Sequence, residues 1–247
     1  MTVPEAMSGA TPTLVIIPAF NEEDALPSVL RDLSGRPGLD VIVIDDGSTD
    51  RTAEVAAAQG VTVLSLPFNL GIGGALRTGF LYAVRNGYVQ AVQFDGDGQH
   101  DPDEIPTLLA ALDEGADMVV GSRFAGEATS YAPGRVRARA MGVLRFTIKT
   151  LSGQQFSDTS SGFRAFNRDV LEFFARTYPS EYMESVEALL LACAEGFQVT
   201  EVPVEMRERE AGQPSTRRLR LVYHYLRLLV VLVASAPRRA VVREARS

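Results

Sequence analysis

The chain has 247 residues, a formal net charge of −7 and 46% hydrophobic residues. This length and apolar content fit one large α/β domain with a sizeable core, and they exclude a chain that is mainly disordered. The single cysteine, Cys193, excludes an intrachain disulfide.

Apolar, β-rich runs alternate with helix-like segments through the first half of the chain. We predict strands at 13–19, 40–46, 61–66, 90–95 and 117–122. We predict helices between and after them, at 22–34, 51–60, 73–87 and 102–115. Strands that are apolar on both faces, separated by helices, indicate a mostly parallel sheet with helices on both sides. The fold class that we expect is therefore α/β.

This alternation ends after residue 122. Residues 123–165 are rich in arginine, glycine, serine and threonine, and we expect one helix there, near 136–151. Later elements are predicted as helices near 167–176 and 181–195, a strand at 198–206, an arginine-rich loop at 207–218 and a last helix at about 217–235. No linker is long enough to separate two domains.

Three polar clusters directly follow predicted strands. They read PAFNEE at 18–23, DDGSTD at 45–50 and DGDGQH at 95–100. Each cluster alone would suit a turn or a helix cap. The carboxyl ends of parallel strands meet at one rim of the sheet, where open α/β sheets bind ligands. Three clusters at one rim therefore indicate a binding site.

The third cluster carries two carboxylates, Asp95 and Asp97, followed at the same spacing by Gln99. An EF-hand loop is excluded, because its sixth and twelfth positions would be His100 and Pro106 instead of glycine and glutamate. The pattern fits a hard divalent cation that is also bound by a diphosphate and water. For His100, an acid–base role and a capping or packing role both remain open.

The segment NLGIGGALRTG, at 69–79, is not a dinucleotide fingerprint, because the third glycine of that pattern is replaced by Leu76. It does bring glycine backbone, Gly71 included, to the start of a helix. The N–H groups there can face a phosphate or a ribose, and a packing role for these glycines is equally open.

Six segments together resemble family 2 glycosyltransferases of the GT-A fold, in the branch of dolichyl- and polyprenyl-phosphate mannosyl- and glucosyltransferases. The segments are VIIPAFNEE, VIVIDDGSTDRT, NLGIGGALRTG, FDGDGQHDP, MVVGSRF and SDTSSGFRAFNR, in the family's order and spacing. The resemblance covers about residues 13–215. It implies a Rossmann-like nucleotide-diphospho-sugar transferase fold with a mostly parallel sheet.

The resemblance also implies roles for individual residues. Nucleotide binding falls to Pro18, Ala19, Asn21, Glu22, Asp46, Gly71 and Asp95. Asp95, Asp97 and Gln99 are implied to hold Mg²⁺ or Mn²⁺. Catalytic roles are implied for Asp97, Arg123, Asp158 and Arg209. The loop of Arg209 departs from the family pattern, since its serine is displaced to Ser215 and its lysine is missing; Arg217 or Arg218 could supply that charge.

The basic charge is concentrated at the C-terminus. Residues 215–247 hold eight arginines and one acid, so the body is acidic, which argues against general nucleic-acid binding. The uncharged stretch 228–236 is shorter than the roughly 20 residues of a spanning helix. We expect a flexible tail at 1–12, a glycosyltransferase domain at 13–215 and a basic amphipathic helix and tail at 216–247. That helix would bind an anionic membrane surface or a small integral membrane subunit, or close the core.

These features predict an inverting, metal-dependent glycosyltransferase. It would move one sugar from a UDP- or GDP-linked donor to polyprenyl phosphate, as a peripheral protein at the cytoplasmic face of the cell membrane. One alternative is a soluble transferase with a small acceptor such as phosphoglycerate. Another is a nucleotide-sugar-binding protein without turnover, which the presence of both Asp95 and Asp97 disfavours.

Overall fold

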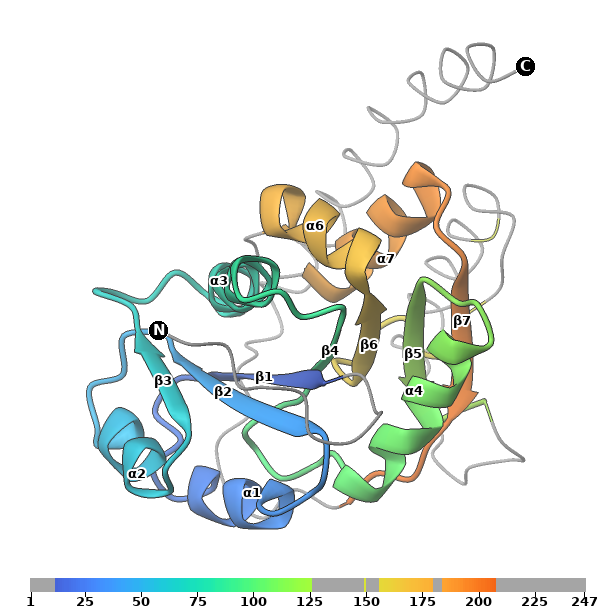
Figure 1. Ribbon diagram of the computed structural model, residues 1–247. Coiled ribbons are helices and arrows are strands. Elements are labelled where there is room, and N and C mark those ends of the chain that lie inside the picture. The colour runs from blue at the N-terminus through green and yellow to red at the C-terminus, as the bar shows by residue number, and fades with distance from the viewer. Residues whose placement is uncertain (1–11, 126–148, 150–155, 180–183, 208–247) are drawn as a thin grey trace, which may run out of the picture.

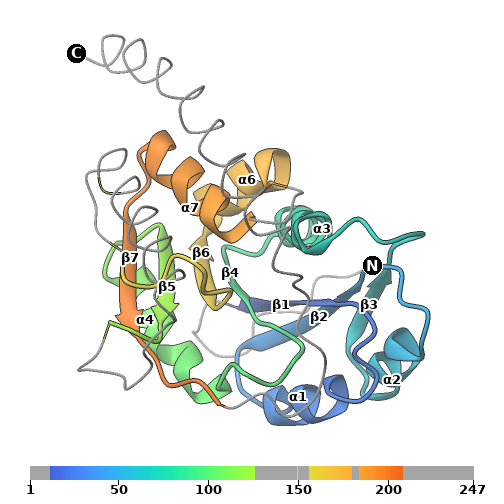
Figure 2. The same cartoon turned by 180° about the vertical axis from the view of Figure 1, so that it is seen from behind.

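The computed structural model describes residues 12–125, 149, 156–179 and 184–207. Within these residues, one seven-stranded sheet has the order β3-β2-β1-β4-β6-β5-β7 (Figure 1). The strands are β1 (Thr13–Ala19), β2 (Leu39–Asp45), β3 (Thr62–Ser65), β4 (Gln90–Gln93), β5 (Met118–Ser122), β6 (Arg164–Asn167) and β7 (Val199–Pro203). Seen from behind, β3 and β7 lie at the two edges (Figure 2).

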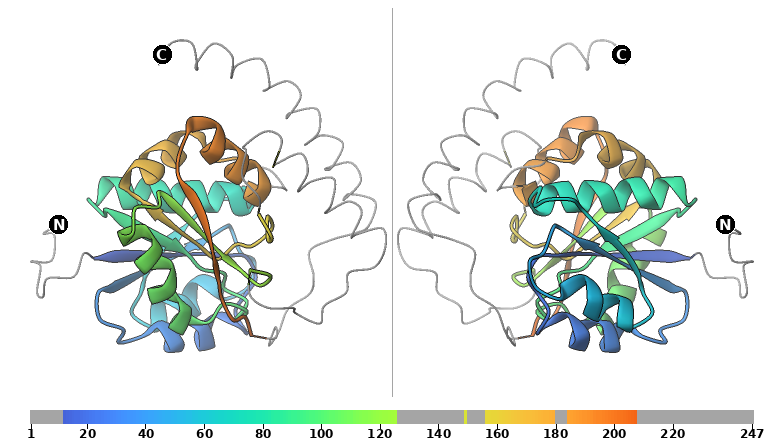
Figure 3. Two further views of the ribbon diagram at one scale, coloured as in Figure 1. Left: turned by 90° about the vertical axis from the view of Figure 1, so that its right-hand side faces the viewer. Right: turned by 90° about the vertical axis from the view of Figure 1, so that its left-hand side faces the viewer.

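Helices cover both faces of this sheet. They are α1 (Leu26–Leu33), α2 (Thr52–Ala58), α3 (Ile72–Arg85), α4 (Ile105–Asp113), α6 (Arg168–Thr177) and α7 (Glu184–Glu195), with a short 3₁₀ helix η1 (Pro102–Glu104) before α4. Helices α3, α6 and α7 lie on one face, and α1, α2 and α4 lie on the other (Figure 3). The predicted α/β class is confirmed.

Each face of the sheet has its own apolar core. Alternate residues of β1 divide between them, since Ile16 packs on the side of α3 and Ile17 on the side of α1. On the α3 side, Phe80 packs edge-on against Phe166 with ring centroids 5.1 Å apart. Strands that bury both faces need apolar side chains at every position, which explains why β1 has no polar alternation.

Parallel pairing joins β1 to β2 and β4, so the carboxyl ends of these strands meet at one rim. Thr13 is in register with both Leu39 and Gln90. Strand β6 runs antiparallel to β4 and β5, with Arg164 opposite Gln93. Because β6 is reversed, the segment that precedes it approaches the same rim.

Two differences from the predicted elements have clear physical causes. Helix α1 begins at Leu26, not near Glu22, because the residues before it are held against the second polar cluster and the start of α2: the N–H groups of Glu22 and Glu23 donate to Thr52 Oγ1 at 2.9 Å and Asp50 Oδ2 at 3.2 Å. Strand β6 was not predicted, because it has only four residues and begins with a charged one, Arg164, which is fully buried.

Several expected features lie wholly or almost wholly outside the described residues. These are the N-terminal tail, most of the helix near 136–151, and the loop and helix that follow residue 207. The outer boundaries of the predicted domain therefore stay predictions. Among the residues that are described, none of the helices combines the length and the hydropathy needed to cross a bilayer.

Candidate functional site

A cleft of about 270 Å³ opens at the rim where β1, β2 and β4 end. Seven of the residues that line it were predicted as site residues: Pro18, Ala19, Glu22, Asp46, Gly71, Asp95 and Asp97. Five others line it without having been predicted: Phe20, Asn69, Ile72, Ala75 and Gly96. All five lie inside motifs described above: Phe20 and Gly96 in two of the polar clusters, and the other three in the segment 69–79, so motif membership was the signal that pointed to them.

One wall of the cleft depends on the buried carboxylate of Asp46. Its Oδ1 accepts a hydrogen bond of 2.7 Å from the backbone N–H of Leu70, which fixes the loop before α3. Burial raises the pKa of Asp46, and the N–H groups of Leu70 and Gly71 partly oppose that rise. Gly47 has φ +69°, and a Cβ there would lie 2.7 Å from the carbonyl carbon of Phe68. Only glycine allows the two loops to approach this closely.

Asn21 ties the first polar cluster to the second. Its backbone adopts φ 55°, its N–H donates to Ser48 Oγ at 3.0 Å, and its Oδ1 accepts from the N–H of Thr49 at 2.9 Å. Asn21 is not among the residues that line the cleft. In this structure it shapes the loops that surround the predicted nucleotide site, and direct nucleotide contact stays a prediction.

The third cluster forms a tight loop at the end of β4, residues 95–101, which we call the metal loop. Asp97 Oδ1 accepts from the N–H of Gln99 at 3.0 Å, and Gly98 takes φ +79° to close the turn. Asp95 and Asp97 line the cleft, whereas Gln99 does not.

The donor set of the metal loop fits Mg²⁺ or Mn²⁺. Carboxylate and amide oxygens are hard ligands, and these ions keep coordination positions for substrate phosphates and water. The described residues contain no group of three or more His, Cys, Asp or Glu side chains that could hold a metal by themselves. Two carboxylates beside an open cleft therefore suit an ion shared with a diphosphate.

His100 packs beneath the metal loop. Its Nδ1 accepts from the N–H of Asp95 at 3.0 Å, and its Nε2 lies 3.5 Å from Asp95 Oδ2. The ring stacks on Phe163 with centroids 4.7 Å apart. Burial lowers the pKa of His100 to about 4, so the imidazole is neutral at neutral pH and its proton lies on Nε2, toward Asp95. The packing role is the one observed; Asp101 provides the helix cap by accepting from the N–H of Asp103.

Two predicted catalytic residues, Arg123 and Asp158, form an ion pair. Arg123 Nε donates to Asp158 Oδ2 at 2.7 Å and Nη2 donates to Oδ1 at 3.1 Å. Asp158 is fully buried, which by itself would raise its pKa. The hydrogen bonds and charge of Arg123, with a contribution from Ser160, outweigh burial and hold that pKa below its usual value. Asp158 is therefore ionised, and both of its oxygens orient other groups.

The antiparallel strand β6 is what brings Asp158 to the rim. The backbone N–H groups of Ser157 and Asp158 donate to the carboxylate of Glu201 on β7, at 2.7 and 2.8 Å. Ser157 Oγ and Ser122 Oγ lie 2.7 Å apart. The segment before β6 is thus held to the end of β5 and to the middle of β7, beside the metal loop.

A buried polar layer lies behind Asp95. A Cβ on Gly162 would be 2.8 Å from Asp95 Oδ2 and 3.2 Å from Gln93 Nε2. Arg164 is fully buried and donates to the carbonyls of Ser161 and Thr159. Among the described residues, the Gln93 amide and Arg164 Nη1 have no hydrogen-bond partner. The close contact at Gly162 fixes where the Asp95 carboxylate can lie.

Some predicted site residues cannot be placed. Arg209 and the arginines expected near it, Arg217 and Arg218, lie outside the described residues. The described chain ends at Arg207, two residues before Arg209.

Comparison with known families gives one matching profile over most of the described chain. The profile of the family described as "Glycosyl transferase family 2" matches residues 14–174. This span includes β1 to β6, the cleft, the metal loop and the Arg123–Asp158 pair.

Several curated proteins are similar over most of their length. Polyprenol monophosphomannose synthase of Mycolicibacterium smegmatis is 36% identical over 215 residues, covering 81% of this chain and 79% of that protein. Undecaprenyl-phosphate mannosyltransferase of Micrococcus luteus is 34% identical, covering 81% and 85%. A UDP-N-acetylglucosamine–dolichyl-phosphate N-acetylglucosaminyltransferase of Methanococcus voltae is 30% identical, covering 77% and 84%.

Among solved structures, glucosyl-3-phosphoglycerate synthase of Mycobacterium tuberculosis is similar in fold. Its complex with Mn²⁺, UDP-glucose and phosphoglyceric acid superposes with a TM-score of 0.67 at 23% identity, covering 91% of this chain and 79% of that one. At this identity the likeness speaks for the fold alone.

Proposed function

Because the chain belongs to glycosyltransferase family 2 and has the GT-A fold, we propose that it transfers one sugar from a UDP- or GDP-linked donor to polyprenyl phosphate. The observation that carries this proposal is the cleft lined by Asp46, Asp95 and Asp97 in a chain whose relatives are named as polyprenyl-phosphate sugar transferases. The class of acceptor rests on those names, and the class of donor rests on the cleft.

The donor would lie along the cleft from Asp46 to the metal loop. The nucleoside end would occupy the pocket between Pro18, Asp46 and Gly71, and the diphosphate would lie beside Asp95 and Asp97. The backbone of Gly96, which also lines the cleft, leaves room for a bulky diphosphate. When bound, Mg²⁺ or Mn²⁺ supplies electrostatic stabilisation of the charge that develops on the leaving diphosphate.

In the reaction, a phosphate oxygen of the acceptor forms a bond to the anomeric carbon as the bond from that carbon to the diphosphate breaks. The nucleoside diphosphate leaves with the electron pair, and attack from the opposite face inverts the anomeric centre. A lipid phosphate arrives already ionised, so no strong general base is required. This agrees with the neutral, buried His100 and with the ionised, fully hydrogen-bonded Asp158.

We assign Arg123 to the phosphates. The Asp158 carboxylate holds its guanidinium by two hydrogen bonds, and about two-fifths of the Arg123 side chain remains exposed, 39%. A guanidinium that is oriented by a buried carboxylate and remains partly exposed is suited to stabilise a developing negative charge. Asp158 then serves as a positioning residue for Arg123, and Arg209 stays a predicted second cation.

We further propose that residues 216–247 bring the enzyme to its lipid acceptor. Their arginine-rich composition favours an anionic membrane surface or a small integral membrane subunit, at the cytoplasmic face. This part of the proposal rests on sequence alone.

The decisive experiment incubates the protein and Mn²⁺ with a panel of labelled nucleotide sugars. Each donor is tested with polyprenyl phosphate, with 3-phosphoglycerate and with no acceptor, and the products are partitioned into organic solvent. Label that enters the organic phase only with polyprenyl phosphate supports the proposal. Aqueous product formed only with phosphoglycerate would support the rival with a small acceptor. Binding of a nucleotide sugar without any product would favour a binding protein without turnover.

A further inference from the structure

The chain that leaves β7 is bound by its backbone to the metal loop and the helix that follows it. The N–H of Arg207 donates to the carbonyl of Gln99 at 2.8 Å, and Met206 forms an antiparallel bridge with His100. One residue earlier, the N–H of Glu205 donates to Glu104 Oε1 at 3.1 Å. A segment that lies about a hundred residues later in the chain thus supports the metal loop from outside.

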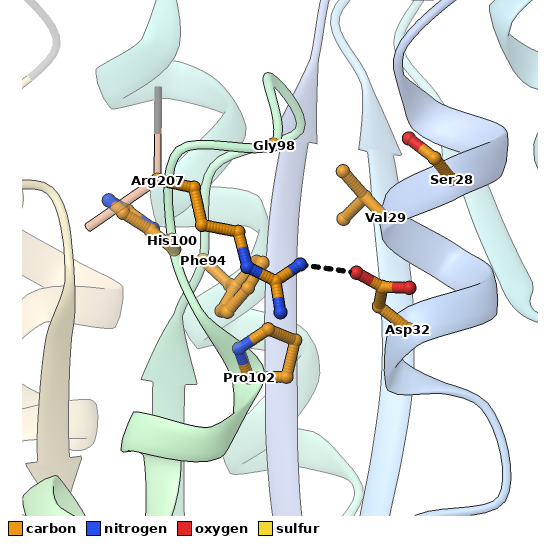
Figure 4. A pocket seen from close by; sticks show the side chains of 8 residues that line it. All are labelled: Ser28, Val29, Asp32, Phe94, Gly98, His100, Pro102 and Arg207. Carbon is orange, nitrogen blue, oxygen red and sulfur yellow. Dashed lines mark hydrogen bonds and ion pairs between the residues drawn. The ribbon is translucent and has the colours of Figure 1, made fainter. Parts of the chain in front are cut away.

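The side chain of Arg207 extends this contact to a third element (Figure 4). Its Nε and Nη2 donate to the two oxygens of Asp101, at 3.2 and 3.0 Å. Its Nη1 donates to Asp32 Oδ2 on helix α1. One guanidinium therefore joins the end of the metal loop, helix α1 and the exit of β7.

This guanidinium is held firmly although it is partly exposed. The hydrogen bonds that Arg207 donates to Asp32 and Asp101 raise the pKa of Arg207. The N–H of Asp103 and the guanidinium of Arg207 both donate to the Asp101 carboxylate, which is therefore held by two elements. Partly exposed ion pairs contribute little to global stability, so the effect of this one should be sought in the loop that it holds.

We propose that Arg207 is a positioning residue of the transfer reaction, which holds the metal loop in the geometry that binds the cation and the diphosphate. Its backbone N–H contacts Gln99, and its side chain acts through Asp101 on a loop whose other end carries Asp95 and Asp97. This inference rests on the proposed function.

The chain offers a matched control. Arg36 forms an ion pair with Asp103, with Nη2 and Oδ1 2.7 Å apart, and its side chain is 30% exposed. That pair joins the end of α1 to the start of η1, close to the metal loop, without contacting the exit of β7. Arg36 Nε also donates to the backbone carbonyl of Asp32, at 2.8 Å. Removing Arg36 therefore measures the cost of losing a neighbouring surface ion pair together with one hydrogen bond to the backbone of α1.

The test uses the full-length protein and its variants Arg207→Met, Arg207→Lys, Asp32→Asn and Arg36→Met. Binding of Mn²⁺ in the presence of UDP, or of GDP if the wild-type chain prefers it, is measured by titration calorimetry. We expect Arg207→Met to weaken Mn²⁺ binding by at least tenfold. Arg207→Lys and Asp32→Asn should show intermediate losses, since each keeps some of the hydrogen bonds between Arg207, Asp32 and Asp101. Arg36→Met should stay within about twofold of wild type. Melting temperatures of Arg207→Met and Arg36→Met should differ by no more than a few degrees.

The outcomes separate this inference from the proposed function. If the wild-type chain binds no Mn²⁺–nucleotide, the proposed function fails. If wild type binds and Arg207→Met binds equally well, the role of Arg207 is refuted while the proposed function stands. Equal losses in Arg207→Met and Arg36→Met would likewise overturn the inference, because they would show a general loosening of the surface.

Discussion

Gly162→Ala should damage the active site while sparing the fold. The added Cβ would lie 2.8 Å from Asp95 Oδ2 and 3.1 Å from Oδ1, whereas ordinary contacts begin at 3.4 Å. The carboxylate must therefore move by about 0.6 Å, which exceeds the roughly 0.5 Å within which catalytic groups must be held. Since a misplacement of about 1 Å can cost 100-fold, we expect kcat/KM to fall by about 10- to 100-fold.

Stability should change little in this variant. The group that must yield is the end of a side chain at the edge of the cleft, so the cost should lie near the lower end of the range for overpacking, about 1 kcal/mol. For a domain of this size, that corresponds to a fall in Tm of about 2–4 °C. The assay therefore compares sugar-transfer kinetics across a Mn²⁺ titration with thermal unfolding of the same samples.

Gly79→Ala should show the opposite result, a loss of stability without a loss of activity. Its Cβ would lie 2.3 Å from Ile16 Cγ2 in the core between α3 and the sheet, away from the cleft. Overpacking near 3 kcal/mol, offset by about 1 kcal/mol of helix propensity, leaves a net loss of about 2 kcal/mol. We expect a lower Tm with kcat/KM per folded molecule unchanged.

Wild-type Mn²⁺ dependence and kinetics in Gly162→Ala would refute the reasoning, because the Asp95 carboxylate would then be free to move without consequence.

Three further predictions concern charge. Asp97→Asn should lower turnover by at least about 100-fold, and full activity in this variant or in excess EDTA would contradict the metal assignment. Because the pKa of Asp158 is lowered in the folded state, its ionic contribution is present above the ordinary value of 3.8 and is lost as the pH falls through the lowered pKa. The unfolding free energies of wild type and Asp158→Asn, measured by denaturant titration, should therefore differ at neutral pH and converge as the pH falls below about 4. A difference that stays constant with pH would argue against an ionised Asp158. Binding of the intact chain to anionic vesicles should fall steeply with salt, and sedimentation that detects no binding at any salt would remove direct lipid binding by residues 216–247.

The sequence was most informative where structure depends on local patterns. Apolar, β-rich runs, most of them followed by turn and cap residues, predicted β1 to β5 and the rim at which Asp46, Asp95 and Asp97 meet. These signals are local because a strand that is buried on both faces must be apolar throughout, whatever its partners.

Features that depend on distant parts of the chain could not be predicted in this way. Strand β6 has no apolar run of its own. From the sequence alone its buried Arg164 would be predicted at the surface, because the backbone carbonyls that accept its hydrogen bonds are known only from the structure. The contacts of Arg207 with Asp32 and Asp101 span 175 and 106 residues. Nothing in the local sequence singled out Arg207, because the family resemblance pointed to Arg209 instead.

The position of β6 also constrains the order in which the molecule can assemble on the ribosome. Strands β1 to β4 come early in the chain and pair with one another, so they can form a nascent sheet before the rest is synthesised. Strand β5 is translated next, but its place in the sheet lies beyond β6, which has not yet been made. For that interval β4 and β5 both present unpaired backbone, the state in which nascent chains are most prone to wrong pairing and aggregation. Vectorial synthesis thus leaves the loop of Asp95 and Asp97 at an open sheet edge until β6 emerges, and the two halves of the active site are joined only when that strand is inserted between them.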